Sequence, residues 1–256
     1  MKKLVLALTA VAAFTGSAVA ADLGARPYTK APAPVAYAPS WTGCYLGAGG
    51  GGAMTNNDAN IFDPATGAAL SGNVTSGARG WFGTVQGGCD YQFNNWVVGA
   101  FADYDFMDVH GDTGVLPGLN GSQKQDWQWA VGARVGYLVL PQLLTYVSGG
   151  YTQAHWKTTN LNFFGALAPV ATLPGTTKGG WFIGTGDEYA LSFLPGLFWK
   201  TEYRYSEFDR ANVTINDFAT GLPLAGLAAT EKFREHSVRS ELVYRFNWAG
   251  PVVAKY

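Results

Sequence analysis

Acidic and basic side chains recur two residues apart along several segments of this chain of 256 residues. Asp103 and Asp105 form one such pair, and Glu202 and Arg204 form another. On an extended strand, residues two apart lie on the same face. A pair of carboxylates could act as general acid and base in hydrolysis if a cleft admitted a substrate. Ion pairing with bases on neighbouring strands is the favoured interpretation, because buried charges need partners.

Bases that could pair with these acids lie on the polar faces of other segments. We expect one structural network in which acids and bases are in rough balance, with no catalytic, cofactor-binding or metal-binding residue. Its predicted members are Asp90, Asp103, Asp105, Arg134, Glu188, Lys200, Glu202, Arg204, Arg239, Glu241 and Arg245.

Other patterns suggest chemistry that the surrounding sequence does not support. Residues 47–52 match the glycine fingerprint of dinucleotide-binding folds, but a loop-like sequence follows them, so close packing of a strand is expected. His110, His155 and His236 lack the spacing of metal ligands, and ordinary surface or interior positions are expected. No nucleophile elbow, phosphate-binding loop or zinc motif is present. We therefore predict no enzymatic activity and no cofactor.

The segments that would position the charges alternate between polar and apolar residues. In the stretch from His236 to Trp248, one face carries Leu242 and Tyr244, whereas the other carries Glu241 and Arg245. This period of two indicates a strand with two different surroundings. A soluble sheet would turn the charged face to water, whereas a membrane barrel turns the apolar face to lipid and the polar face to the lumen.

Alternating stretches of this kind recur along the chain, and no segment after residue 40 has the apolar length of a transmembrane helix. Their polar faces combine glycine with charges of both signs, which suits the crowded interior of a narrow barrel. The sequence therefore predicts an all-β fold, an eight-stranded antiparallel up-and-down transmembrane β-barrel. The expected strands are roughly Trp41–Met54, Arg79–Tyr91, Trp96–Met107, Lys124–Val139, Leu144–Lys157, Gly179–Ala190, Leu197–Asp209 and Lys232–Trp248.

The apolar faces place aromatic residues near both strand ends, which is typical of the two interfacial girdles of a membrane barrel. Asp187 departs from the pattern, because it falls on the predicted lipid face near one rim. One rim is expected to hold Trp41, Tyr91, Trp96, Tyr137, Tyr189, Trp199, Phe246 and Trp248. The other is expected to hold Tyr104, Phe106, Trp127, Trp129, Trp156, Trp181 and Tyr205.

The connections between the expected strands fall into two length classes. Short turns of membrane barrels face the periplasm and long loops face outward. The short ones are 93–95, 140–142 and 191–196, and the long ones are 55–78, 108–123, 158–178 and 210–231.

The N-terminal region and the overall composition define the compartment. Residues 1–20 have the features of a secretory signal peptide, with a basic start, an apolar run and a cleavage site after Ala20 or Ala21. The Ala- and Pro-rich residues 21–40 predict an extended periplasmic linker, and residues 41–256 the barrel. A net charge of −1 gives no case for a nucleic-acid partner.

Cys44 and Cys89 are the two cysteines of the chain. An exported protein enters an oxidising compartment, in which disulfides form. Both cysteines fall near the periplasmic ends of adjacent expected strands and on the same face, so we predict a disulfide with the usual Cα separation of ~4.4–6.8 Å. Two free thiols that merely lie near each other are the alternative.

Short stretches throughout the chain resemble small eight-stranded outer-membrane proteins of alphaproteobacteria. These are the opacity-type "porin family" barrels, related in architecture to the N-terminal domain of OmpA. Barrels of this kind usually end at an aromatic residue that serves as the assembly signal, and here either Phe246 or Tyr256 could carry that role. The matching stretches are residues 21–30, 41–47, 184–190, 200–205 and 243–248.

The resemblance implies an integral protein of the outer membrane with a structural or surface-exposed role in the cell envelope. Its expected partners are outer-membrane lipid and lipopolysaccharide, the barrel-assembly machinery, and host or ligand molecules that contact the extracellular loops. Family members are described as porins, adhesins or haem binders, so the resemblance does not choose among these roles. The alternatives are a narrow diffusion pore, loop-mediated adhesion or ligand binding, and a soluble ligand-binding barrel of lipocalin type.

Overall fold

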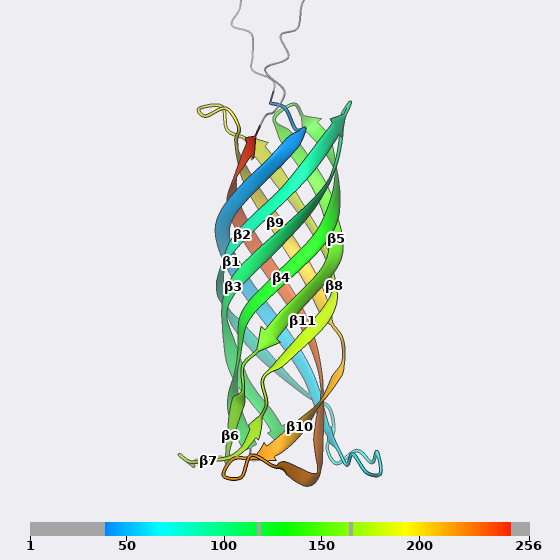
Figure 1. Ribbon diagram of the computed structural model, residues 1–256, viewed down its shortest axis with the longest axis vertical. Coiled ribbons are helices and arrows are strands. Elements are labelled where there is room, and N and C mark those ends of the chain that lie inside the picture. Colours follow the sequence, from blue (N-terminus) through cyan, green and yellow to red (C-terminus); the bar gives the residue numbers. More distant parts are fainter. Residues whose placement is uncertain (1–38, 117–118, 164–165, 247–256) are drawn as a thin grey trace, which may run out of the picture. The chain divides into compact units, whose positions relative to one another are not determined.

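The computed structural model describes residues 39–116, 119–163 and 166–246, which form antiparallel β-strands joined by turns and loops (Figure 1). Within this part of the chain, no helix is long and apolar enough to cross a membrane. The strands are β1 (Gly43–Phe62), β2 (Val74–Phe93), β3 (Trp96–Leu116), β4 (Leu119–Leu140), β5 (Leu143–Trp156), β6 (Thr159–Phe163), β7 (Pro169–Leu173), β8 (Thr176–Ala190), β9 (Leu197–Phe208), β10 (Ala211–Asp217) and β11 (Pro223–Phe246).

Eight of these strands close into a ring in the order β1-β2-β3-β4-β5-β8-β9-β11, because β11 pairs back with β1. Each pairing in the ring is antiparallel. Closure satisfies the backbone of every ring strand on both sides and leaves no free edge, as a strand surrounded by lipid requires. The predicted eight-stranded antiparallel up-and-down transmembrane β-barrel is confirmed.

Three short strands, β6, β7 and β10, extend the wall of the barrel at one end. Strand β6 pairs with β4, β10 pairs with β11, and β7 lies between β6 and β10. Each continues a ring strand after a two-residue interruption, at residues 157–158, 174–175 and 209–210. The wall at this end therefore again contains eight strands, with β6, β7 and β10 in place of β5, β8 and β9.

Most residues of the four expected long loops belong to strands, so that expectation was wrong. Strand β1, for example, continues to Phe62, with Asn57 buried and Asn56 exposed. Beyond the bilayer the outward face of a strand no longer has to be apolar, so the hydrophobic alternation disappears while the strand continues. The three expected short connections are turns, and we call the end that carries them the inner end, because short turns of membrane barrels are expected to face the periplasm.

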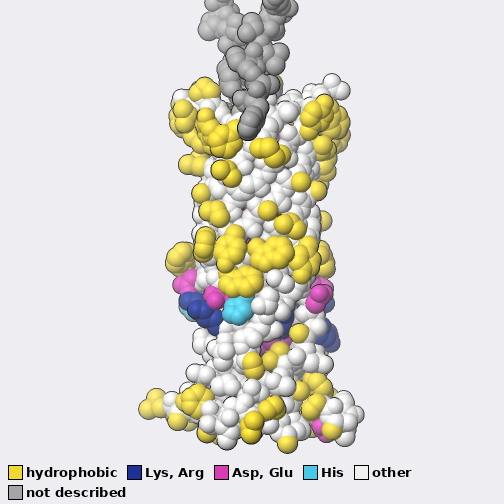
Figure 2. Space-filling model, in the orientation of Figure 1, with side chains coloured by type: hydrophobic (Ala, Val, Ile, Leu, Met, Phe, Trp, Pro, Cys, Tyr) yellow, Lys and Arg dark blue, Asp and Glu magenta, His cyan; other side chains and the backbone are white. Residues whose placement is uncertain are grey.

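Along the ring strands, side chains alternate between a buried lumen face and an exposed outer face. Figure 2 shows hydrophobic side chains gathered near one end and around the middle of this face, with a belt of charged and histidine side chains just beyond the middle band. Most predicted girdle residues lie exposed or half-buried on the outer face. They are Tyr91, Trp96, Tyr137, Tyr189, Trp199 and Phe246 at the inner rim, and Tyr104, Phe106, Trp127, Trp129, Trp181 and Tyr205 at the outer rim.

Two girdle assignments were wrong, because Trp41 and Trp156 are buried inside the barrel. Trp41 lies before the first residue of β1, and its indole N–H donates to the Pro141 carbonyl at 3.2 Å. Trp156 ends β5 and stacks on Phe233 with ring centroids 4.2 Å apart. Both follow the alternation of their strands, because Trp41 has the parity of buried Tyr45 and Trp156 that of buried Ala154, so the girdle assignment placed them on the wrong face.

The two cysteines lie directly opposite each other on β1 and β2, and a disulfide joins them. The Cα atoms of Cys44 and Cys89 are 3.9 Å apart, closer than expected.

The glycine-rich run at residues 47–52 lies within β1 and is not followed by a helix. A Cβ atom at Gly49 or Gly51 would collide with the backbone of β11 at Ser240 or Val238. These glycines therefore permit close approach of the strands that close the barrel. The predicted signal peptide, the girdle residue Trp248, Tyr256 and all but the last two residues of the predicted linker lie outside the described residues.

Candidate functional site

At the inner end of the lumen, four charged side chains from different strands form a closed group of ion pairs. This inner cluster consists of Asp90, Arg134, Glu188 and Arg245, all buried. Arg134 donates to an Asp90 oxygen at 3.0 Å and to Glu188 at 2.8 Å. Arg245 donates to the same two carboxylates, each at 2.7 Å. Because both guanidiniums bind both carboxylates, the inner cluster links β2, β4, β8 and β11 across the lumen.

Aromatic side chains pack around the inner cluster and fill the remaining space. The Arg245 guanidinium lies 5.1 Å from the ring centre of Trp41 and 4.9 Å from that of Phe198. The Arg134 guanidinium lies 4.8 Å from the ring centre of Tyr45. Stacking of a desolvated cation on an aromatic face is favourable. The aromatic packing and the ion pairs therefore occlude the lumen together.

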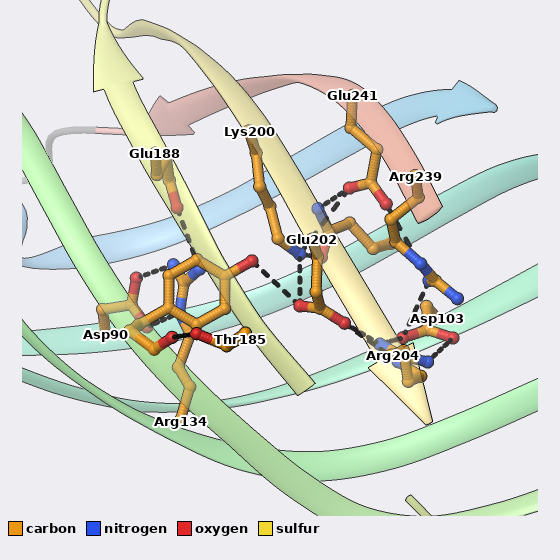
Figure 3. A network of polar contacts seen from close by, with 12 residues as sticks. Asp90, Asp103, Arg134, Thr185, Glu188, Lys200, Glu202, Arg204, Arg239 and Glu241 are labelled. Carbon is orange, nitrogen blue, oxygen red and sulfur yellow. Dashed lines mark hydrogen bonds and ion pairs between the residues drawn. The ribbon is translucent and has the colours of Figure 1, made fainter. Parts of the chain in front are cut away.

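The mid-lumen cluster is a second charged group that lies further outward. Both Nη atoms of Arg204 bind Asp103, at 3.1 and 2.8 Å, and its Nε donates to Glu202 at 2.9 Å (Figure 3). Arg239 donates to Asp105 at 2.9 Å. The members of this mid-lumen cluster are Asp103, Asp105, Lys200, Glu202, Arg204, Arg239 and Glu241, and all are buried.

Several polar atoms of the mid-lumen cluster have no hydrogen-bond partner among the described residues. They include Oδ1 of Asp105, Oε1 of Glu241, and Nε and Nη1 of Arg239. In the inner cluster, by contrast, every side-chain nitrogen and every carboxylate oxygen has a hydrogen-bond partner. Unpartnered buried polar groups are costly unless water reaches them, so we expect ordered water in the mid-lumen cluster.

Every predicted member of the charge network faces the lumen and takes part in at least one ion pair with another member. Asp103 and Asp105 are each held by an arginine and are buried, which disfavours acid–base chemistry. Asp187 lies exposed on the outer face, and its carboxylate accepts a hydrogen bond from Thr145 at 2.6 Å.

Sequence reasoning missed buried polar residues that complete the network. The Lys200 ammonium donates to Gln86 at 2.8 Å, and Tyr146 donates to Glu202 at 2.9 Å. Gln86 shares the polar face of its strand with Asp90, so the alternation could have identified it. Further outward, Lys178 donates to Glu231 at 3.1 Å in a region expected to be loop.

The outermost part of the lumen contains mainly apolar side chains. Lys178 lies 4.4 Å from the ring centre of Phe233, which packs with Trp156 and Phe208. Beyond them lies a cluster that we call the outer apolar cluster. Its buried members are Ile61, Leu119, Leu161, Ala171, Leu173, Val213, Ile215 and Ala229.

The histidines occupy separate positions outside the lumen. His155 Nδ1 lies 2.6 Å from Asp126, His236 Nδ1 lies 2.7 Å from the Tyr203 hydroxyl, and His110 is exposed. Within the described ranges, no group of three or more histidine, cysteine or acidic residues is arranged to hold a metal ion. The geometry therefore supports occlusion and strand cross-linking by the lumen residues.

No protein-family model matches the sequence. Among solved structures, the chain is similar to Neisserial surface protein A, with 13% identity, a TM-score of 0.38 and coverage of 80% of this chain and 98% of that one. It is also similar to OprG from Pseudomonas aeruginosa, with 15% identity, a TM-score of 0.48 and coverage of 81% and 99%.

Among proteins of known sequence, the chain is 33% identical over 253 residues to the 31 kDa outer-membrane immunogenic protein of Brucella melitensis biotype 1. The match covers 96% of this chain and 100% of the relative. The protein of the same name from Brucella suis biovar 1 gives the same identity and coverage. The chain therefore belongs to the family of the 31 kDa outer-membrane immunogenic protein, and it is an integral β-barrel of the outer membrane with its place in the cell envelope.

Proposed function

We propose that the protein is a closed barrel that contributes structure to the outer membrane, presents its outer end at the cell surface and has no enzymatic activity. The observation that carries this proposal is the filling of the lumen at successive levels. The inner cluster, the mid-lumen cluster and the outer apolar cluster follow one another along the barrel. Eight strands enclose a space just wide enough for such side chains, whereas water-filled porins need ~16–18 strands.

Planar-bilayer recording of the purified protein tests the closed state. We expect no large, steady conductance steps, because an ion would have to displace buried and paired side chains. Steady steps of porin size from single barrels would overturn the proposal. An unheated sample that migrates differently from a boiled one in SDS gel electrophoresis verifies that the recorded protein is a folded barrel.

A narrow diffusion pore is the second candidate, and the unpartnered atoms of the mid-lumen cluster favour it. Asp105, Arg239 and Glu241 all carry such atoms, so this level can hold water. Glu241→Gln or Arg239→Gln should then produce small, rare openings that the native chain lacks. Lys232→Gln is the matched control, because Lys232 forms a half-buried ion pair with Glu207 on the outer face, away from the lumen. Equal behaviour of all these variants would reject the pore.

The outer end also supports contacts with host or ligand molecules. Phe163, Leu167, Phe218 and Leu222 are large apolar residues that stay exposed there, and Leu167 is 99% exposed. Large apolar side chains that remain exposed in the connections at this end favour interaction with a partner. A binding assay that compares the native chain with Leu167→Ser and Phe218→Ser would test this contact.

A further inference from the structure

A row of outward-facing residues crosses five strands just beyond the outer aromatic girdle. Met54 on β1 lies opposite His236 of β11 on one side and opposite Arg79 of β2 on the other. Arg79 in turn lies opposite His110 of β3, and His110 opposite Lys124 of β4. Directly opposite side chains have Cβ atoms ~4.5–5.5 Å apart, and like charges in such positions repel. The row thus brings two cationic side chains, Arg79 and Lys124, close to the imidazole of His110, and it ends at a second imidazole on β11.

An open groove of ≈470 Å³ lies along this row, and Arg79, His110 and His236 line it together with Met54. Met54 is 62% exposed, and Trp81, two residues from Arg79 on the same face, is 65% exposed. Figure 2 shows the belt of charged and histidine side chains directly beside the hydrophobic band. The groove therefore opens at the height where lipid headgroups meet the hydrocarbon region.

Arg79 differs from the neighbouring cations because it lacks an acidic partner. Lys124 lies 2.5 Å from Asp108, Lys232 lies 2.7 Å from Glu207, and Arg234 lies 2.7 Å from Asp58. No carboxylate oxygen of the described residues lies within 4.0 Å of the Arg79 guanidinium.

Asp108 does not supply the missing negative charge. It lies 3.9 Å from His110, but its carboxylate is bound to the Lys124 ammonium, whose hydrogen bond is the main reason that the pKa of Asp108 is lowered. The groove therefore presents a free guanidinium and two imidazoles to an anion from outside the chain.

We propose that this groove binds a phosphate group on the sugar headgroup of a phosphorylated glycolipid in the outer leaflet. The planar guanidinium of Arg79 suits two parallel hydrogen bonds to phosphate oxygens, and the exposed ring of His110 supplies another donor. Met54 and Trp81 offer apolar surface to the acyl chains on the membrane side. The proposal goes beyond the closed-barrel function, because it concerns the outer face and holds whether or not the lumen conducts.

Native mass spectrometry of the detergent-solubilised full chain tests the site. The probes are bis-phosphorylated lipid A, the same lipid without its phosphates, and inorganic phosphate. We expect the native chain to bind the phosphorylated lipid, and Arg79→Gln with His110→Gln to weaken that affinity roughly 10-fold, since loss of a charge-assisted hydrogen bond is of this order. Arg79→Gln alone should show a smaller loss in the same direction.

Arg234→Gln is the matched control, because it removes one positive charge from the same belt at a residue that already has a partner. Its affinity should stay within about twofold of the native chain, because a surface ion pair contributes little. Heat-dependent gel mobility shows that each variant is a folded barrel before binding is measured. Equal binding of the lipid without phosphates, or an equal loss in Arg234→Gln, would overturn the proposal. Binding of inorganic phosphate as tight as that of the lipid would overturn the glycolipid assignment.

Discussion

At the inner end of the lumen, two arginines and two carboxylates bind one another, whereas at the outer end eight apolar side chains pack together. The inner cluster joins strands that cross the bilayer, and the outer apolar cluster lies among the extensions that β6, β7 and β10 contribute. A buried charge that loses its partner is left uncompensated, but a truncated apolar side chain leaves only a cavity. The two ends should therefore respond differently to substitution. A change in the inner cluster should lower the stability of the whole barrel, whereas a change in the outer apolar cluster should loosen only the strands around it.

Arg245→Gln should have the largest effect. Arg245 donates to Glu188, to Asp90 and to the Trp41 carbonyl, so its removal leaves two buried carboxylates short of a partner. We expect a loss of ~3–5 kcal/mol in the free energy of unfolding. Denaturant unfolding in lipid vesicles measures the loss. Arg234→Gln, at a half-buried ion pair on the outer face, serves as the control, with a loss below ~1 kcal/mol. Similar losses in the two variants would show that the inner cluster does not stabilise the fold.

Leu242→Arg should have the next largest effect. It changes the outer, lipid-facing side of β11, the strand that also carries Arg245 of the inner cluster. Leu242 is 53% exposed on the lipid-facing side of β11. An arginine near the middle of the bilayer costs ~2–4 kcal/mol, and the cost falls to ~0–1 kcal/mol near an interface. The folded yield in vesicles should therefore fall for Leu242→Arg and change little for Tyr244→Arg. Equal yields would contradict the assignment of this face to lipid.

Ile215→Ala should act locally at the outer end. Ile215 is 1% exposed in the outer apolar cluster, and its truncation should cost about 2 kcal/mol. We expect faster hydrogen exchange in β6, β7 and β10 but not in β5, β8 and β9, because the extensions can open separately. Ile215→Val, with a cost of ~0.5–1.5 kcal/mol, provides the graded control. Equal acceleration in both sets of strands would show that the two ends unfold together.

The smallest effect concerns the ion pair between Asp58 and Arg234 on the outer face. A hydrogen bond from Thr75, and next the contacts with Arg234, lower the pKa of Asp58 below its usual value. The stabilisation is thus present above the unfolded-state pKa and is lost as the pH falls through the lower folded-state pKa. Asp58→Asn should reduce stability by ~0.2–1 kcal/mol at neutral pH and by nothing at a pH below both values. A loss that persists in acid would refute this assignment.

The sequence by itself determined which face of each membrane-crossing strand meets lipid. A period of two assigns alternate residues to opposite faces, and charges such as Arg204 and Glu241 can be stabilised only on the lumen side. The same pattern also fits Trp41 and Trp156, whose girdle assignments went against the parity of buried Tyr45 and Ala154. The hydrophobic alternation ended with the bilayer, so the extensions of β1 and β11 were missed. Outside the membrane nothing requires the outward face to be apolar.

Only the tertiary structure decided which acid pairs with which base. Arg134 and Asp90 are 44 residues apart in sequence, and Arg204 and Asp103 are 101 apart. Alternation gives the face of a residue but not its height along the barrel, which depends on the register between paired strands and on the closure of β1 against β11. The groove at Arg79 arises in the same way, because its histidines come from β3 and β11 and line one groove only when the ring is closed.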